Sequence, residues 1–217
     1  MIPKIIHQIW IGDKRIPKHI GQWMQEIKDA HPNYTYYLWT DRNLPKLPEA
    51  LSHIYHNSTD PITWPTKSDL LRIYIVYKYG GVYMDADFKL IDGLNNLSDE
   101  FENKDGIITV SDTYGMEALG NNFFAFDKNH FMLQLLMDDI NSVHQWIGPN
   151  YWANTISNYF GYDELVTFDR FESDLSNHNI KLLNTSELET KYFQHVALAS
   201  WLPGSEWNKK FKQDGYE

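Results

Sequence analysis

The sequence has no cysteine, an excess of acidic over basic residues and no long apolar run. The absence of cysteine excludes disulfides and thiolate chemistry, and it favours a reducing compartment. The formal net charge of −10 argues against nucleic acid or anionic lipid as the main partner, because both need a basic surface. No apolar run approaches the roughly 20 residues of a membrane-spanning helix, and no signal-peptide pattern is present. Taken as a complete chain, the sequence predicts a cytoplasmic protein without a transmembrane segment.

The length and composition are those of a globular protein. A chain of 217 residues with 42% apolar residues can bury a sizeable core. No internal repeat or low-complexity linker divides it, so we expect a single domain over residues 1–217. Aromatic residues make up 15% of the chain, which suits stacking platforms for planar or sugar rings and large core side chains equally well.

Strand-like and helix-like segments alternate along the chain. Residues 4–11 are typical of a buried strand, a helix is expected from about Pro17, and residues 34–39 are expected to form a second strand. This order predicts an α/β domain with a mixed, mainly parallel sheet flanked by helices. The further elements we expect are strands at 82–88, 106–110, 123–126, 180–183 and 194–199, and helices at 70–79, 130–146 and from 148 onward.

The segment at 66–69, Thr-Lys-Ser-Asp, has the form of a capping box. It predicts a helix that begins at about Leu70, is apolar on nearly all sides and ends at Gly80-Gly81. Such a helix belongs in the interior of the domain.

Two carboxylates interrupt the apolar run GGVYMDADF at 80–88. On a strand, Asp85 and Asp87 would project from the same face. One interpretation is a hydrated strand end, and another is a phosphohydrolase with Asp85 as the nucleophile. A divalent cation explains the pair better, because Mn²⁺ and Mg²⁺ bind one or two carboxylates and leave other positions to substrate phosphates. An EF-hand loop is excluded, because Lys89 and Leu90 occupy its acidic and glycine positions.

Three segments, IPKIIHQIWIG (2–12), KSDLLRIYIVYKYGGVYMDAD (67–87) and QHVALASW (194–201), together resemble the DXD-containing sugar transferases. This group includes glycosyltransferase family 32, with yeast-type mannosyltransferases and bacterial capsule enzymes, and is related to the glucosylating domains of large clostridial toxins. The resemblance implies a GT-A-type fold and a metal-dependent, retaining hexosyltransferase. It would move sugar from a UDP- or GDP-linked donor to a glycan, a lipid-linked or another hydroxyl acceptor, in polysaccharide or glycoconjugate synthesis.

The resemblance assigns roles to four residues of the central block. Asp87 would ligate the metal, and Asp85 would lie near the donor ribose and sugar, within reach of the metal. Asp69 and Arg72 would bind the donor sugar hydroxyls and the pyrophosphate region. The alternative for the latter two is an ion pair on one helix face, since they are three residues apart.

The N-terminal strand would contribute to donor binding. In the related toxin domains a tryptophan matching Trp10 stacks on the nucleotide base, and Gln8 and Ile9 would flank that base. A tryptophan at the end of an apolar strand is otherwise a core residue.

The C-terminal segment carries an H-x-x-x-x-S-W pattern. His195 would be a further metal ligand, since neutral imidazole binds Mn²⁺ well. Ser200 and Trp201 would contact the β-phosphate through the hydroxyl and the indole N–H, although the toxin relatives separate these two residues by one position.

Other segments match family features that border the sugar and acceptor cleft. Asn121-Asn122 and 148–150 (Gly-Pro-Asn) are expected to border the cleft, with an asparagine turn and a proline-initiated helix as the alternatives. Of these residues, Asn122 is predicted to bind the donor. The basic-aromatic tail at 207–212 would give peripheral contact with a membrane-bound acceptor. A non-catalytic nucleotide-sugar binding protein stays as an alternative function.

Overall fold

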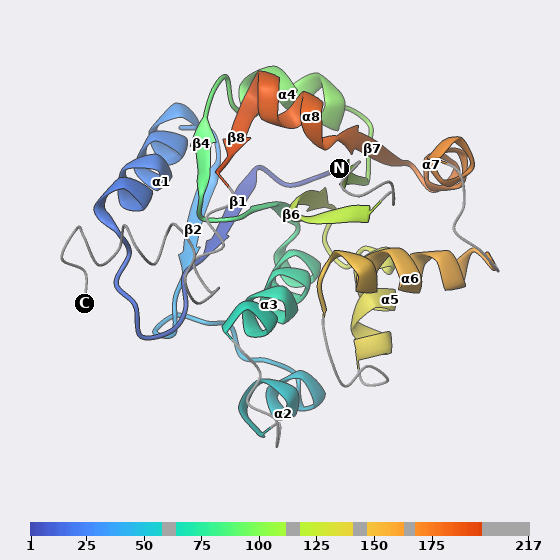
Figure 1. Cartoon of the computed structure of the whole chain (residues 1–217), viewed down its shortest axis with the longest axis horizontal. Helices are drawn as coiled ribbons and strands as arrows, with labels where there is room; N and C mark the ends of the chain where they lie inside the picture. Colours follow the sequence, from blue (N-terminus) through green and yellow to red (C-terminus); the bar gives the residue numbers. More distant parts are fainter. Residues whose placement is uncertain (58–63, 112–117, 141–146, 163–167, 197–217) are drawn as a thin grey trace.

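The computed structural model describes residues 1–57, 64–111, 118–140, 147–162 and 168–196. Its centre is a six-stranded sheet with the strand order β2-β1-β3-β6-β5-β7 (Figure 1). Strand β1 pairs in parallel with β2 and β3, and β5 pairs in parallel with β7, whereas β6 runs antiparallel to β3 and β5. The predicted mixed, mainly parallel sheet is confirmed. The strands are β1 (Ile5–Ile9), β2 (Thr35–Trp39), β3 (Gly81–Met84), β5 (Gly106–Ser111), β6 (Ala118–Phe126) and β7 (Ile180–Asn184).

Side chains alternate between the two faces of this sheet, as strand geometry requires. Tyr83 and Phe124 point to one face, which is covered by α3 (Trp64–Tyr79), α5 (Phe131–Asp139) and α6 (Pro149–Tyr159) (Figure 1). Val82, Met84 and Phe123 point to the other face, which is covered by α1 (Lys18–Ala30), α4 (Leu94–Phe101) and a two-stranded sheet of β4 (Phe88–Leu90) and β8 (Phe193–His195).

Helix α3 runs through the interior, and its residues from Leu70 to Val76 are all buried. It begins at Trp64, so the prediction of a capping box at 66–69 is wrong: those residues lie inside the helix, with Pro65 in its first turn, where proline is tolerated. The predicted end is confirmed. Gly80 and Gly81 both have positive φ, and a Cβ on Gly81 would lie 2.6 Å from the carbonyl oxygen of Ile5.

The predicted continuous strand at 82–88 is also wrong. Strand β3 ends at Met84, residues 85–87 form a turn, and Phe88 begins β4, which pairs with β8 instead of the main sheet. The physical cause is a second packing site, because Phe88 contacts Phe193 of β8 and Phe123 below it. The chain therefore leaves the main sheet at the two carboxylates.

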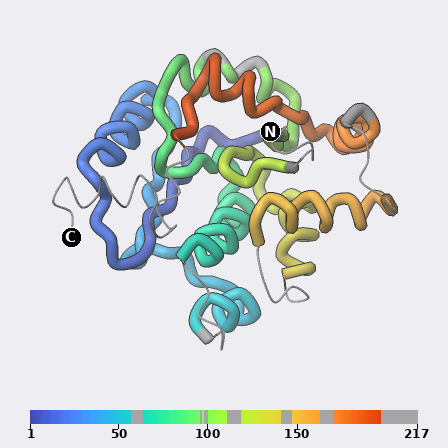
Figure 2. The backbone as a smooth tube through the Cα atoms, in the orientation of Figure 1, coloured from blue at the N-terminus to red at the C-terminus, as the bar shows by residue number. Residues whose placement is uncertain are grey.

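The remaining elements complete the path of the chain (Figure 2). Helix α1 and strands β1, β2, β5 and β7 lie close to their predicted positions, whereas β6 begins earlier than predicted. Short helices that the sequence pattern did not reveal are α2 (Glu49–Asn57), α4, α7 (Phe168–Asn177) and the turn α8 (Thr185–Glu187), which continues into the π-helical η3 (Leu188–Tyr192). The predicted ends at 141–146 and 197–199 lie outside the described residues.

Candidate functional site

The carboxylate turn lies at the carboxyl end of β3, at the edge of the sheet where β1 also ends. Asp85 faces helix α3 and contacts Arg72, whereas Asp87 faces β8 and contacts His195. The sequence pattern predicted that the two carboxylates share one strand face, and this prediction is wrong. The turn nevertheless keeps the two carboxylates close, and Asp85, Asp87 and His195 each offer one ligand atom within 4.8 Å of the others.

Arg72 connects the carboxylates on the α3 side of the site. Its Nη2 lies 3.1 Å from Oδ1 of Asp69, and its Nη1 lies 3.3 Å from Oδ1 of Asp85. The hydroxyl of Tyr83 donates to the same Asp85 oxygen at 2.6 Å, and the guanidinium lies 4.8 Å from the centre of the Tyr83 ring. Asp69, Asp85 and Arg72 thus form one network.

The guanidinium of Arg72 is largely committed to partners within the protein. Besides both carboxylates, Nη1 donates to the carbonyl oxygen of Asn121 at 2.7 Å, and Nε and Nη2 donate to Ser68 at 3.4 Å. The residue is only 6% exposed. Planar guanidinium geometry suits such a fork of acceptors. In this arrangement Arg72 organises Asp69 and Asp85, and its predicted contact with the donor phosphates stays a prediction.

The electrostatics of the site favour a bound cation. Burial raises the pKa of Asp69 to about 6, although the charge of Arg72 opposes this shift. Burial also raises the pKa of Asp85 against the opposing effect of Arg72, and the neighbouring Asp87 carboxylate adds to the rise. Negative charge is therefore incompletely compensated here, and a divalent cation would relieve that condition.

A bulge in β6 positions two asparagines between the two halves of the site. Ile108 of β5 pairs with Phe124, but the next residue, Thr109, pairs with Gly120, so residues 121–123 have no counterpart on β5. The Thr109 hydroxyl closes the bulge by donating to the carbonyl oxygen of Phe123 at 2.9 Å and of Gly120 at 3.3 Å. It lies 2.2 Å from where a Cβ on Gly120 would be, so this position requires glycine.

The bulged asparagines point to different partners. Asn121 donates from Nδ2 to Oδ1 of Asp69 at 2.9 Å. Asn122 places its Nδ2 3.0 Å from Nδ1 of His195, and its backbone carbonyl accepts from the N–H of Asp85 at 2.9 Å. The predicted donor contact of Asn122 stays a prediction, but the structure does bring this residue into the site.

His195 ends strand β8, with its Nε2 3.4 Å from Oδ1 of Asp87. Its ring stacks on Phe88, with the ring centres 4.8 Å apart. Burial lowers the pKa of His195, but the carboxylates of Asp87, Asp85 and Glu189 outweigh this effect and raise it. Two carboxylates and an imidazole are a ligand set that suits Mn²⁺, and the oxygens also suit Mg²⁺. The residues present therefore fit a divalent cation.

The N-terminal residues predicted to bind the base surround the turn from the β1 side. Gln8 is buried, donates to the carbonyl oxygen of Asp85 at 3.0 Å and accepts from the hydroxyl of Tyr36 at 2.5 Å. The side chain of Ile9 lies in the core. Trp10 is partly exposed and donates from Nε1 to the carbonyl oxygen of Lys14. Like Ala86 of the turn, it packs against the buried pair Ile20 and Met24. Gln8 thus fixes the turn, and base stacking by Trp10 stays a prediction.

The structure does not test the remaining predicted site residues. Ser200, Trp201 and the tail at 207–212 lie outside the described residues. Gly148-Pro149-Asn150 begins α6, so the alternative of a proline-initiated helix is confirmed for this segment. The sequence argument missed Tyr83 and Thr109, whereas Asn121, which was expected at the border of the cleft, lies in the site beside Asp69. For Tyr83, the only signal was its place two residues before Asp85, which puts both side chains on one face of the chain.

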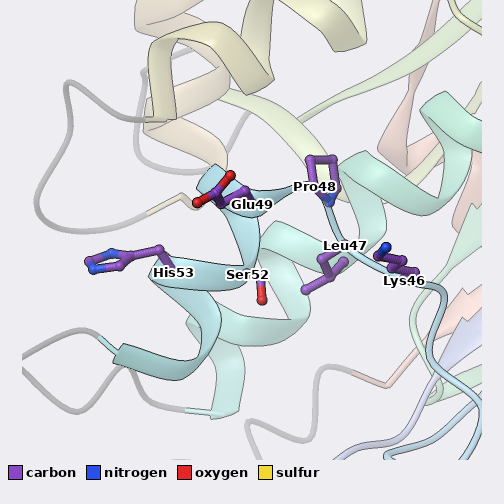
Figure 3. Close-up of a pocket in the computed structure, with 6 residues that line it drawn as sticks. All are labelled: Lys46, Leu47, Pro48, Glu49, Ser52 and His53. Atoms are coloured by element: carbon purple, nitrogen blue, oxygen red, sulfur yellow. The ribbon is translucent and has the colours of Figure 1, made fainter.

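An open pocket of about 580 Å³ lies beside α2, away from the carboxylate turn. Figure 3 shows His53 pointing outward from α2, away from Lys46 and Leu47. In Figure 1, α2 and the β4–β8 sheet lie at opposite ends of the molecule. No residue of the carboxylate site lines this pocket, so we do not assign the chemistry to it. Its lining residues are Lys46, Leu47, Pro48, Glu49, Ser52 and His53.

Comparisons with known proteins agree with the geometry. Residues 17–103 match the family described as "Glycosyltransferase sugar-binding region containing DXD motif". The match includes Asp69, Arg72 and the Asp85–Asp87 turn, whereas His195 lies beyond it. The predicted resemblance to DXD-containing sugar transferases is confirmed.

Two curated relatives carry ceramide in their names. The chain is similar to inositol phosphoceramide mannosyltransferase 3 of Schizosaccharomyces pombe, with 32% identity over 137 residues, which are 62% of this chain and 36% of that protein. It is also similar to human lactosylceramide 4-alpha-galactosyltransferase, with 32% identity over 89 residues, which are 41% of this chain and 22% of that protein. The chain therefore spans little more than a third, or less, of the length of these two relatives.

Solved structures share the fold. PaToxG glycosyltransferase superimposes with a TM-score of 0.57 at 18% identity, covering 82% of this chain and 73% of that one. The catalytic domain of alpha-toxin from Clostridium novyi gives a TM-score of 0.50 at 13% identity, covering 98% and 82%. The predicted GT-A-type α/β fold is confirmed.

The expectation of a cytoplasmic protein is wrong. Both curated relatives are named for acceptors that contain ceramide, which is a membrane lipid. The sequence argument failed because missing cysteines and short apolar runs do not tell where an enzyme meets a lipid acceptor. Among the described residues, no helix combines the length and the apolar character needed to cross a membrane.

Proposed function

We propose that this chain, whose residues 17–103 match the DXD-containing glycosyltransferase family, transfers a hexose from a nucleotide-diphosphate sugar to a hydroxyl group of a glycolipid. The observation that carries the proposal is that Asp85 and Asp87, which follow β3, lie together with His195, which ends β8. A hydrated strand end would not require His195 or the buried Arg72 beside it.

The cation site is the first part of the proposed mechanism. Asp87 and His195 would hold Mn²⁺ or Mg²⁺, with Asp85 as the third protein ligand. When bound, the cation acts as a Lewis acid that neutralises charge on the leaving diphosphate. The backbone of the turn is held in place by two hydrogen bonds. Gln8 donates to the carbonyl oxygen of Asp85, and the carbonyl oxygen of Asn122 accepts from the N–H of Asp85.

Sugar positioning is the second part. The side chains of Asp69 and Asp85 are 18% and 25% exposed, whereas that of Arg72 is 8% exposed. The carboxylates can therefore accept hydrogen bonds from donor hydroxyls while Arg72 fixes them from behind. Preorganised groups of this kind favour the transition state, because they need no rearrangement when charge develops.

The acceptor and the stereochemistry are the third part. The names of both curated relatives contain ceramide, so we propose a ceramide-linked head group as the acceptor in preference to a soluble polysaccharide. We also propose retention at the anomeric carbon, as the resemblance to the toxin-related transferases implies. Proton NMR of the product's anomeric signal would establish the stereochemical course.

A thermal-shift panel of UDP- and GDP-sugars, each with and without Mn²⁺, tests the donor site. We expect one nucleotide sugar to stabilise the protein, and to do so more strongly with Mn²⁺. The positive donor is then offered inositol phosphoceramide or lactosylceramide in mixed micelles, with transfer followed by mass spectrometry. Stabilisation without hydrolysis or transfer would indicate a binding protein. Phosphate release from a phosphomonoester, without donor binding, would indicate the D-x-D phosphohydrolase.

A further inference from the structure

The side chain of Asn122 has one polar atom engaged and one that lacks a partner. Its Nδ2 lies 3.0 Å from Nδ1 of His195. Its Oδ1 is buried and has no hydrogen-bond partner among the described residues. A buried amide oxygen without a partner is destabilising, so this arrangement requires an explanation.

The two nitrogens of His195 face different groups. Nδ1 faces the Asn122 amide, and Nε2 faces Oδ1 of Asp87 at 3.4 Å. A neutral imidazole carries one proton, so one nitrogen donates and the other accepts. With the Asn122 nitrogen toward the ring, Nδ1 accepts and the proton lies on Nε2, which then cannot bind a cation.

The opposite orientation of the Asn122 amide favours the other tautomer of the His195 ring. A half-turn about the last side-chain bond of Asn122 exchanges Oδ1 and Nδ2, which have nearly the same shape. The oxygen then accepts a proton from Nδ1 of His195, and Nε2 presents a lone pair toward Asp87. The buried oxygen thereby gains the partner that it lacks.

The bulge can accommodate this second orientation. Oδ1 of Asn122 and Oγ1 of Thr109 both lie beside Gly120, at 3.0 Å and 2.2 Å from the position that a Cβ would take there. The half-turn exchanges two atoms of nearly the same size, so it needs no more space than the amide already occupies. The missing side chain of Gly120 leaves room for the amide.

We propose that Asn122 is a positioning residue for the cation site: the orientation of its amide decides which nitrogen of His195 carries the proton, and the orientation with oxygen toward the ring allows Nε2 to bind the cation. This inference rests on the cation site proposed above. It assigns Asn122 to His195, in addition to any contact with the donor. Groups that orient a histidine ligand in this way commonly change metal affinity 10–100-fold.

Two variants and a control separate the outcomes. Asn122→Leu removes both polar atoms at similar size, and Asn122→Asp keeps an acceptor toward Nδ1. Asn158→Leu, at an exposed position on α6, is the matched control. Mn²⁺ affinity is measured by EPR of the free ion, and the His195 tautomer by long-range proton–nitrogen NMR with Mg²⁺ as a diamagnetic ion. Circular dichroism shows that each variant is folded.

We expect Asn122→Leu to weaken Mn²⁺ binding about 10–100-fold, and Asn122→Asp and the control to show no such loss. The parent ring should carry its proton on Nε2 without metal and on Nδ1 with Mg²⁺, and Asn122→Asp should favour the Nδ1–H form in both conditions. Unchanged affinity and an unchanged tautomer in folded Asn122→Leu would overturn the proposal.

Failure of the cation site itself has a different signature. If the parent protein binds neither Mn²⁺ nor Mg²⁺, the proposed function fails. The tautomer of His195 in the metal-free parent and in Asn122→Asp still tests the asparagine–histidine contact. Identical tautomers in those two proteins would overturn the role assigned to Asn122 independently of any metal.

Discussion

The guanidinium of Arg72 lies 3.3 Å from the carboxylate of Asp85, and this ion pair connects the interior helix α3 to the turn that follows β3. Because Arg72 is 6% exposed, its charge depends on the carboxylates beside it. The ion pair holds Asp85 against α3 before any ligand is bound. A metal-free protein should therefore already hold the donor-facing carboxylates in place.

Replacing Arg72 with lysine tests whether the arginine fork aligns the carboxylates of the site. Arg72→Lys keeps the charge but loses the fork that joins Asp69, Asp85 and the Asn121 carbonyl. We expect transfer activity to fall about 100-fold, because the carboxylates lose their alignment, and the free energy of unfolding to fall by about 2 kcal/mol. Arg170→Lys is the matched control, since Arg170 also lies over a tyrosine ring, that of Tyr162, but is exposed and outside the site. Equal losses in the two variants would contradict the special role of Arg72.

The hydroxyl of Thr109 holds the β6 bulge closed, and its removal should open it. Thr109→Val leaves the carbonyls of Gly120 and Phe123 without their donor, and we expect the free energy of unfolding to fall by about 1–3 kcal/mol. Transfer activity should fall by more than the loss of folded protein accounts for, because the bulge positions Asn121 and Asn122. Thr109→Ser retains the hydroxyl and should restore most of the activity. Urea unfolding and initial rates at saturating donor measure the two effects, and a fully active valine variant would show that the bulge does not position the site.

Asp69 should make the protein less stable as the pH rises. Its folded-state pKa of about 6 lies above the ordinary value of 3.8, so the folded state favours the neutral acid. The stability that this preference contributes is present below pH 3.8 and is lost as the pH rises through about 6. At neutral pH, Asp69→Asn should therefore raise the free energy of unfolding, by at most about 3 kcal/mol, and abolish transfer.

The pH dependence of the difference is the decisive part of that experiment. The gain from Asp69→Asn should appear between about pH 4 and pH 6 and stay constant above. Asp29→Asn, at an exposed position on α1, is the matched control. A gain that does not vary with pH would mean that the amide stabilises the helix for reasons unrelated to the ionisation of Asp69.

Sequence periodicity predicted the parts of the fold that are determined locally. The run of isoleucines at the start gave β1, and Ile20, Met24 and Ile27 gave α1, because both periods are visible within a few residues. The helices α2 and α7 were missed because they are short and partly polar, so packing against neighbours rather than their own pattern determines them.

The site was predicted in its residue types more than in its geometry. Asp85 and Asp87 were expected on one strand face, but the pairing of Phe88 with His195 across β4 and β8 turns the chain between them. The β6 bulge and its threonine could not be foreseen, because they arise from the register between two strands. The link from Asn122 to His195 joins residues far apart in sequence, and only the folded chain brings them together.

Release of nucleoside diphosphate from a nucleotide sugar tests the central claim most directly. The rate is measured for the parent and for Asp87→Ala, each with and without Mn²⁺, and Asp29→Ala is the control. The account predicts Mn²⁺-dependent release by the parent and the control, and no release above background by folded Asp87→Ala. Equal release by the parent and by Asp87→Ala in the presence of Mn²⁺ would contradict the assignment of a catalytic cation to this turn.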